Sequence, residues 1–456
     1  MKTNVHNNLN IESLHIQTLN NKKQAQTFIN QDFKGLKIPL ATYTHFRGQK
    51  GFINRVLLHK MRFAASGIMT DAEKNKWAGT EKLNKKYQPR MSACGVSMGI
   101  LKGNTGVDEK FLNATVDIVK GKDKKVHFHK LASCALIWRC PVCSLKILKG
   151  REDTIYALAK SHERKEKAMG FLTFTLPHAA NETLETNFNK LIQKYNDLQH
   201  QRFFKEFRSG CTRKGLENVG YILGQIKSVE ITWKALNGWH PHLHILNFYD
   251  LGLNEQDKKC INHFQKKCLA WWVSHTGAKM IGQDSQICYG IKGAADYMAK
   301  WDAVKEITSE SLKSSKGISP FGILKKLALN DFRNVQEKIK LRELYREYCE
   351  VTKGRHRISF GRNLRKAYPE VVQDETDQEL CEKIEIREVI MQFHLSAWKQ
   401  ITQKHLQPYL INFYLSGGMS AVVGLLSLKN INFKIEKYSD SLDFETGEFL
   451  QIPQIK

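Results

Sequence analysis

Three histidines at alternating positions are the residues of this chain best suited to bind a metal. They lie at positions 240, 242 and 244 within Gly-Trp-His-Pro-His-Leu-His-Ile-Leu, residues 238–246. In a β-strand, successive side chains point to opposite faces, so the three imidazoles would share one face, with Leu243 and Ile245 on the other. Several imidazoles on one rigid face predict a metal site. The alternative is a polar strand face that happens to be rich in histidine.

A carboxylate is expected to join the histidines from the preceding strand. Residues 222–233 also alternate between apolar and polar side chains, and an Asn-Gly pair before the histidines is typical of a hairpin turn. If Trp233 lies opposite Trp239, then Glu230 lies opposite His242, whereas a slip of one residue would move Glu230 to the other face. Imidazole and carboxylate ligands together suit Mn²⁺ or Mg²⁺, and Zn²⁺ is also compatible with them.

Four cysteines spaced like the ligands of a zinc site precede the histidines. They are Cys94, Cys134, Cys140 and Cys143. The last two belong to a Cys-Pro-Val-Cys turn, in which both sulfurs can reach one Zn²⁺ at about 2.3 Å. Four thiolates would complete a tetrahedral structural site, although His127 and His129 are rivals for the fourth position. Buried free thiols are the alternative to any metal.

A tyrosine downstream of the histidines is a candidate nucleophile. Residues 293–301 predict a short helix that begins at Gly293, and Tyr297 and Lys300 are i, i+3 neighbours on one face of it. A phenolate stabilised by a nearby cation can act as the nucleophile of covalent catalysis. Packing of an amphipathic helix is the alternative role of this tyrosine.

The charge of the chain favours nucleic acid as a partner. The 456 residues carry a formal net charge of +26, and a hydrophobic content of 41% is typical of a folded protein, here of two or three domains. Residues 1–90 hold 16 Lys/Arg against 5 Asp/Glu, whereas residues 367–456 hold 8 against 13. Such a positive field attracts a polyanion; a solvated basic surface is the alternative. The densest basic stretch, which contains no acidic residue, offers as phosphate contacts Lys353, Arg355, Arg357, Arg362, Arg365 and Lys366.

Helices and strands must position these groups. We expect strands over residues 171–178 and 286–289, and helices over 55–63, 144–164, 184–207, 255–277, 341–351, 395–414 and 419–428. The N-terminus lacks the apolar core of a signal peptide, and no apolar run approaches the roughly 18 residues of a transmembrane helix. We therefore expect a cytoplasmic protein without a membrane partner, in which cysteines are free thiols or metal ligands.

In their order along the chain, the cysteine group, the histidine strand and the downstream tyrosine resemble those of the rolling-circle plasmid replication initiators of the HUH endonuclease superfamily. The resemblance covers roughly residues 90–428. Its most specific part is the Gly-Trp-His-Pro-His-Leu-His core followed by Tyr297-Met298-Ala299-Lys300. Supporting features are the cysteine group, the Phe-Leu-Thr-Phe-Thr strand, Thr352-Lys353-Gly354-Arg355, Asp374-Glu375-Thr376-Asp377 and the Gly-Gly pair at 417 and 418.

The resemblance implies an α+β fold built around an antiparallel-sheet HUH endonuclease domain with flanking helices, over residues 166–305. We expect a basic N-terminal arm (1–90) and a cysteine-rich zinc module (91–165) before this domain, and a mostly helical C-terminal region (306–456) after it.

By the same resemblance, the two motif histidines, His242 and His244, would hold a divalent ion, with His240 or Glu230 as the third ligand. Tyr297 would attack the scissile phosphate of DNA and leave a 5′-phosphotyrosyl link and a free 3′-OH, while Lys300 would offset charge at the phosphate. The implied partners are plasmid origin DNA, single-stranded at the nick, and the helicase and polymerase of a bacterial host.

One position departs from the resemblance. Some relatives place a second Tyr or a Glu one helical turn before the nucleophile, to resolve the covalent intermediate, and here that position is Gly293. Two other functions fit part of the pattern. A relaxase or rolling-circle transposase of the same superfamily usually carries larger additional domains. A zinc-containing DNA-binding regulator without nicking activity would need neither Tyr297 nor the histidine face.

Overall fold

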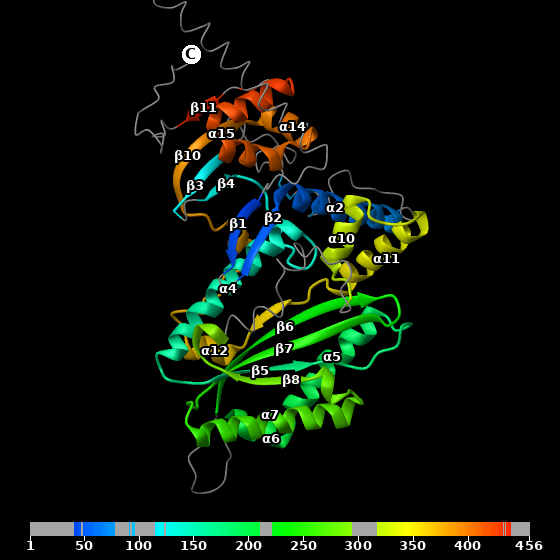
Figure 1. Ribbon diagram of the computed structural model, residues 1–456, viewed down its shortest axis with the longest axis vertical. Helices are drawn as coiled ribbons and strands as arrows, with labels where there is room; N and C mark the ends of the chain where they lie inside the picture. Colours follow the sequence, from blue (N-terminus) through cyan, green and yellow to red (C-terminus); the bar gives the residue numbers. More distant parts are fainter. Residues whose placement is uncertain are drawn as a thin grey trace, which may run out of the picture.

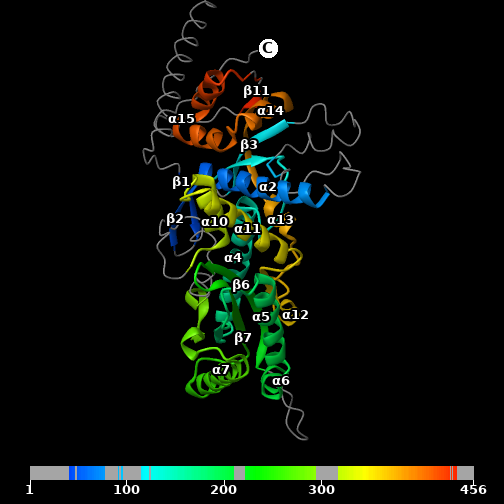
Figure 2. The same ribbon diagram turned by 90° about the vertical axis from the view of Figure 1, so that its right-hand side faces the viewer.

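The computed structural model describes residues 41–46, 49–77, 91, 94–95, 115–122, 125–209, 221–293, 317–431, 433 and 435–438. These residues form an elongated molecule with a five-stranded sheet near one end and a four-stranded sheet at the other (Figures 1 and 2). Between the two sheets lie, among other helices, α2 (Arg55–Trp77), α4 (Pro141–Glu163), α10 (Pro320–Leu329) and α11 (Val335–Val351). The fold is thus mixed, with antiparallel sheets and many helices.

The five-stranded sheet carries the histidine motif. Its order is β8 (Asp284–Cys288), β5 (Met169–Phe174), β7 (Gly238–Tyr249), β6 (Ile222–Lys234) and β9 (Ile358–Phe360). Every neighbouring pair is antiparallel. All six residues of β5 are buried, which is expected of an inner strand with a neighbour on each side. The long strands β6 and β7 form the hairpin predicted from the Asn-Gly pair.

Helices α5 (Leu184–Gln199), α6 (Arg202–Ser209) and α7 (Glu255–Thr276) cover one face of this sheet (Figure 1). The side chains of Thr183 and Asn254 accept hydrogen bonds from the first turns of α5 and α7. Gly277, with a φ of 70°, ends α7 in the left-handed conformation typical of a helix C-terminus. Trp272 is fully buried and packs its ring 4.6 Å from that of Phe174, which fixes α7 against β5.

The opposite face is covered at only one end by described residues. There His162, near the end of α4, packs its ring 5.1 Å from Phe248 of β7. Tyr368, which follows α12 (Arg362–Ala367), lies 6.4 Å from the same phenylalanine ring. Because side chains alternate along β7, Phe248 shares this face with the three histidines, which occupy its other end.

The four-stranded sheet joins two segments far apart in the sequence. Its order is β11 (Ile435–Tyr438), β10 (Ile386–His394), β3 (Thr115–Gly121) and β4 (Val126–His129). Helices α14 (Leu395–Gln403) and α15 (Gln407–Leu428) accompany it, and α15 is interrupted at Gly417 and Gly418, whose dihedral angles are not helical. The region after residue 306, expected to be mostly helical, thus also contributes the three strands β9, β10 and β11.

The described residues form two hydrophobic cores. One core joins Met61 of α2, Ile155 of α4, Phe171 of β5 and Leu344 of α11, so it crosses residues 90, 165 and 305. A second core lies under the four-stranded sheet and combines residues 116–126 with residues 390–431. The cysteine group and the five-stranded sheet therefore share one core.

The remaining described elements are short. They are β1 (Ala41–Phe46), β2 (Gln49–Asn54), the 3₁₀ turn η2 (Met280–Gly282) and α13 (Asp377–Glu382). Thr376 and Glu379 form a capping box at the start of α13, in which each side chain accepts a hydrogen bond from the backbone of the other. Among the helices of the described residues, none combines the length and the hydropathy needed to cross a lipid bilayer.

A substitution at Gly224 tests how closely α12 packs on β6. A Cβ atom there would lie 2.5–2.7 Å from Cβ, N and Cα of Leu364, and two of these are backbone atoms that cannot move aside. We expect Gly224→Ala to lower the free energy of unfolding by about 1–3 kcal/mol, as overpacking does. Gly67→Ala is the matched control, because nothing lies within 4 Å of its Cβ. In that helix interior alanine should stabilise by about 0.5–1 kcal/mol. Urea unfolding of both variants measures the difference, and equal stability would contradict the packing described.

Candidate metal centres

Strands β6 and β7 bring one glutamate and two histidines together on one face of the sheet. The register is the one predicted from the sequence, with Glu230 opposite His242. The turn between the strands ends at Gly238, whose φ of 73° lies in the left-handed region that glycine adopts without strain. His244, two residues after His242, shares its face because side chains alternate along the strand.

Glu230, His242 and His244 place three potential ligand atoms within 4.8 Å of one another. Oε2 of Glu230 lies 3.2 Å from Nε2 of His244 and 3.6 Å from Nδ1 of His242. Burial alone would raise the pKa of Glu230, but the hydrogen bonds and positive charge of the two histidines outweigh it and hold the pKa below its ordinary value. Glu230 is therefore ionised at neutral pH, and the group offers one oxygen and two nitrogen ligands, which fit a divalent ion.

Each of these histidines makes a second hydrogen bond on the side turned away from Glu230. Nδ1 of His244 lies 3.0 Å from Oγ1 of Thr173, and Nε2 of His242 lies 2.9 Å from Nδ1 of His240. Such bonds orient the rings and leave the nitrogen that faces Glu230 available to a metal. Thr173 was not predicted as a site residue, because nothing in the local sequence of β5 indicates that this strand pairs beside β7.

His240 lies next to this group and is not part of it. Its ring is 4.1 Å from that of His242 and 4.5 Å from that of His178. Burial, together with repulsion from these two histidines, lowers the pKa of His240 to about 3, so the ring is neutral at physiological pH. Of the two candidates for the third ligand, the structure places Glu230 with His242 and His244, and His240 as a neighbour that orients His242.

One side of the metal group is open. Strand β5 pairs with β7 only from Leu243 to Phe248, so β6 is the one strand of the described residues that lies beside His240 and His242. Pro241 has no N–H to extend a ladder on that side, which is why proline is tolerated at this place. The side chains of Glu230 and His242 remain 25% and 21% exposed, whereas that of His244 is 5% exposed. A substrate can therefore reach two of the three ligands.

The predicted nucleophile, Tyr297, and its neighbour Lys300 lie outside the described residues. The described chain that precedes them ends at Gly293, which packs against Cys288 of β8. A Cβ atom at Gly293 would lie 2.6 Å from Cβ and 2.9 Å from Sγ of Cys288. The position one helical turn before Tyr297 thus has no room for the second Tyr or the Glu that some of the resembling proteins carry.

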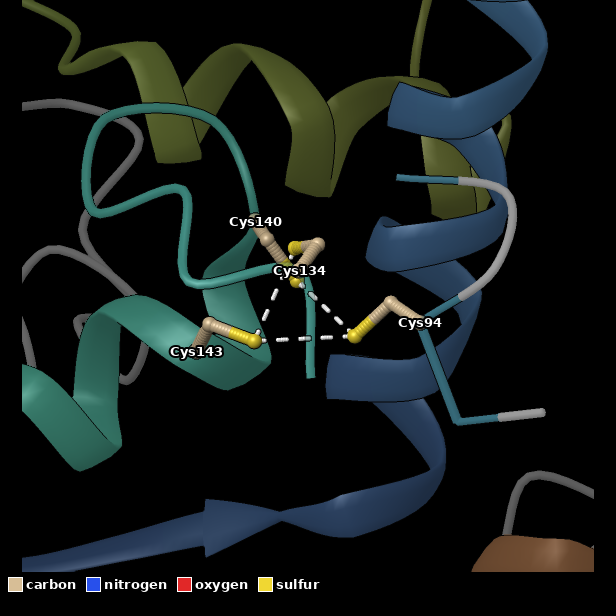
Figure 3. Close-up of side chains that lie close together, drawn as sticks. All are labelled: Cys94, Cys134, Cys140 and Cys143. Atoms are coloured by element: carbon tan, nitrogen blue, oxygen red, sulfur yellow. Dashed lines mark hydrogen bonds between the residues drawn. The ribbon is translucent and has the colours of Figure 1, made fainter. Parts of the chain in front are cut away.

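The four predicted cysteines form a buried cluster (Figure 3). Sγ of Cys143 lies 3.5 Å from that of Cys94 and 3.6 Å from that of Cys134, and Sγ of Cys94 lies 3.7 Å from that of Cys140. A tetrahedron with Zn–S bonds of about 2.3 Å has its sulfurs about 3.8 Å apart. A disulfide would need sulfurs at about 2.05 Å. The spacing therefore fits a zinc ion bound by four thiolates.

Local backbone features bring the four sulfurs together. Cys140 is the N-cap of α4 and Pro141 begins the helix, so Cys143 follows in the first turn. Cys94 is held against the cluster because the N–H of the next residue, Gly95, donates to the carbonyl of Ala132 at 2.8 Å. The two distant parts of the motif are thus joined by a backbone hydrogen bond as well as by the sulfurs.

The fourth position of this cluster is occupied by a cysteine and not by His127 or His129. His127 and His129 lie on β4 in the four-stranded sheet, where Nδ1 of His129 is 3.4 Å from a carboxylate oxygen of Asp117. Hydrogen bonds from Cys134 and Cys140 lower the pKa of the Cys143 thiol. A thiolate, the form that binds zinc, is therefore favoured at Cys143.

The loop that carries these cysteines supports the edge of the five-stranded sheet. Nε1 of Trp138 donates to the carbonyl of Arg355 at 2.7 Å, and the guanidinium of Arg357 lies 5.5 Å from the centroid of a Trp138 ring. The carbonyl of Arg357 accepts a hydrogen bond from the N–H of Val229 at 3.0 Å. Val229 precedes Glu230 in β6, so the cysteine loop and the metal group are linked through one strand edge.

The basic stretch 353–366 runs along the same edge, and its cations differ in exposure. Four side chains are exposed: Lys353, Arg362, Arg365 and Lys366. Arg355 is half-buried, with its guanidinium 4.4 Å from the centroid of the Phe188 ring. Arg357 is only 4% exposed and packs between aromatic rings. The expected DNA contact at Arg357 is therefore corrected: its side chain has a packing role.

Comparison with known proteins gives a distant relationship to a Rep protein. The chain is 28% identical over 134 residues to "Protein rep" of Streptomyces lividans, which covers 25% of this chain and 29% of that protein. It is 27% identical over 132 residues to "Neomycin resistance protein" of Streptomyces cyanogenus, covering 25% of this chain and 30% of that protein. The chain thus matches less than a third of the length of these curated relatives. No protein-family model and no solved structure matches the chain.

Loss of a single cysteine ligand should release the zinc. We expect the purified protein to carry about one zinc ion per chain and Cys140→Ser to carry almost none, with a lower melting temperature, because three ligands cannot close the site. Cys260→Ser is the control, since Cys260 lies on α7, far from the cluster in sequence and half-buried. Elemental analysis measures the zinc content. An unchanged content in Cys140→Ser would contradict zinc binding at this cluster.

The affinity for Mn²⁺ should depend on both the ligands and the residue that orients one of them. We expect Glu230→Gln to abolish measurable binding and Thr173→Val to weaken it by about 10–100-fold, as loss of an orienting hydrogen bond does. Thr232→Val on the same face is the matched control, because the hydroxyl of Thr232 donates to the backbone carbonyl of His240 at 3.5 Å and not to a ring nitrogen. Affinity should also fall as the pH is lowered, since protonated imidazole cannot bind a metal. Titration calorimetry measures these constants; equal loss in both threonine variants would contradict the orienting role of Thr173.

Proposed function

We propose that the protein initiates rolling-circle replication of a plasmid as a metal-dependent DNA nickase and strand transferase of the HUH type. The observation that carries this proposal is the open group of Glu230, His242 and His244 on two paired antiparallel strands. The distant similarity to a protein named rep supports a role in replication. The net charge of +26 is in keeping with a DNA partner.

The covalent step is assigned to Tyr297. Its phenolate oxygen forms a bond to the scissile phosphorus as the bond to the 3′ oxygen breaks, and that oxygen leaves with the electron pair and takes a proton. The products are a 5′-phosphotyrosyl link and a free 3′-OH, from which a host polymerase extends after a host helicase opens the duplex. A divalent ion held by the Glu230 group would polarise the scissile phosphate, and Lys300 would offset charge there.

The two ends of the segment that contains Tyr297 support this assignment. Gly293, before it, packs against Cys288 in the edge strand β8. Ile318, after it, forms an isolated antiparallel bridge with Trp233 at the end of β6. Both ends are thus joined to the sheet that carries the histidines.

Residues of the chain itself prepare the site before DNA binds. Thr173 and His240 hold the rings of His244 and His242 in place, so little conformational freedom is lost when a metal and a phosphate enter. The carboxylate of Glu230 stays ionised because both histidines stabilise its charge.

The exposed cations of the basic stretch would bind phosphates away from the nick. Arg362, Arg365 and Lys366 lie on or beside α12, and Lys353 follows α11, so these four flank β9 on both sides. Phosphate contacts of this kind position the DNA and do not read its sequence. Arg355 is half-buried and would contribute less.

Covalent trapping tests the proposed function. Incubated with Mn²⁺ and supercoiled DNA that carries the origin of its own replicon, the wild-type protein should nick the DNA and give a protein–DNA adduct on a denaturing gel. Tyr297→Phe should give no adduct, because it lacks the attacking oxygen. Tyr289→Phe is the matched control, since Tyr289 donates its hydroxyl to the carbonyl of Glu163 and is not proposed to react.

Other outcomes of this experiment distinguish the competing functions. An adduct that persists in Tyr297→Phe would overturn the assignment of the nucleophile. Specific origin binding without a nick under any divalent ion would exclude the nickase and favour a zinc-containing DNA-binding regulator, which needs the cysteine cluster and the basic stretch alone. Transfer of the bound strand without replication of the plasmid would favour a relaxase or a transposase.

A further inference from the structure

Two turns beside the metal group expose large apolar side chains. Leu236, in the turn between β6 and β7, is 88% exposed, and Ile281, in η2, is 94% exposed. Among the large apolar side chains of the described residues, these two are the most exposed. Exposed apolar side chains held at fixed positions beside a reaction site are potential contacts for an apolar surface of the substrate.

Hydrogen bonds and close packing hold both turns in place. A ring nitrogen of His178 lies 2.7 Å from the carbonyl oxygen of Asn237, and Gly238 approaches Ala180 so closely that a Cβ atom there would lie 2.9 Å from its carbonyl oxygen. On the other side, the amide of Gln283 donates to Oγ1 of Thr175 at 2.9 Å and accepts from its N–H at 2.8 Å. The apolar side chains therefore stand on fixed supports.

The two turns flank the end of β5. His178 and Thr175, which hold one turn each, are three residues apart, so they lie at most about 10 Å from each other along the chain. Two residues before Thr175, Thr173 contacts His244. The last pair of the hairpin is Lys234 with Gly238, so Leu236 at the tip of the turn lies one strand position beyond it. Along the hairpin, the tip is therefore about three positions from His240 and about five from His242, which corresponds to about 10–17 Å. That distance spans about three to five stacked nucleotides.

A lysine accompanies each apolar residue. Lys234 precedes Leu236 by two positions, and Lys279 precedes Ile281 by two positions. Neither lysine forms an ion pair with another described residue, and Lys279 is exposed. A cation next to an exposed apolar side chain suits single-stranded nucleic acid, because the cation attracts the phosphates and the apolar group can lie against the face of an unpaired base.

We propose that Leu236 and Ile281 contact unpaired bases of single-stranded DNA on the two sides of the metal group, with Lys234 and Lys279 at the adjoining phosphates. To contact a base of a duplex in this way, an apolar side chain must first unstack it, at a cost of about a few kcal/mol per step. An unpaired strand avoids most of this cost, so the two turns favour single-stranded DNA. The position of the strand over the metal group rests on the proposed function; the contact with unpaired bases does not.

Serine substitutions test the contact. Full-length Leu236→Ser, Ile281→Ser and the double variant are compared with Leu415→Ser, whose side chain is 58% exposed on α15 at the opposite end of the molecule. Affinity for a mixed-sequence single-stranded oligonucleotide is measured without added divalent ion. Loss of a base contact should weaken binding by about 10-fold in each single variant, and by more in the double variant. The dependence of affinity on salt should not change, because no phosphate contact is removed.

Binding to a duplex of the same sequence and melting temperatures complete the test. We expect all serine variants to bind the duplex and to melt as the wild type does, since the substituted side chains are exposed. A double variant that binds the single strand as tightly as Leu415→Ser would overturn the proposal, and so would a wild-type protein that prefers the duplex. If Tyr297→Phe disproves the nickase while Leu236→Ser still weakens single-strand binding, only the proposed function fails.

Discussion

The pairing of β6 with β7 is the interaction on which the rest of the site depends. Side chains alternate along a strand, so one register places Glu230 beside His242 and His244, and a slip of one residue would turn the carboxylate to the other face. Trp233 opposite Trp239 and a glycine with positive φ at the end of the turn fix that register at the closed end of the hairpin. At the same end Pro241 lies beyond the last pair with β5, so among the described strands only β6 lies beside His240 and His242.

The cysteine cluster stabilises this hairpin from its outer edge. β9 is only three residues long and pairs with β6 at residues 226–228, so its own ladder would hold that edge weakly. The chain just before β9 is fixed instead by Trp138 of the cysteine loop, through a hydrogen bond to Arg355 and a cation–π contact with Arg357. A zinc ion that orders the loop would therefore also order the strand edge next to Glu230. This explains why the cysteines and the sheet share one hydrophobic core.

Local sequence patterns predicted the parts of the site whose partners are close in the chain. The hairpin register followed from alternation and an Asn-Gly turn, and the cysteine cluster from ligand spacing, with Cys94 confirmed over two histidines by geometry. Sequence patterns did not predict contacts between residues that are far apart in the chain. The pairing of β3 with β10 joins residues about 270 positions apart, and Thr173 reaches His244 only because β5 inserts beside β7. Arg357 was misjudged for a related reason: a cation in a basic run gives no sign that aromatic rings from two other segments enclose it.

The two candidate metal groups differ in whether a coordination position is left open, which is the property that separates structural from catalytic metal sites. All four cysteines are at most 3% exposed, and four sulfurs at tetrahedral spacing fill every coordination position of a zinc ion. The Glu230 group offers three protein ligands, two of which are more than a fifth exposed, so coordination positions would remain for a phosphate oxygen or water. A closed group can support the fold but cannot bind substrate, and an open group can do both. Burial and ligand number thus support the different roles proposed for the two groups, a closed structural site and an open site with room for a substrate.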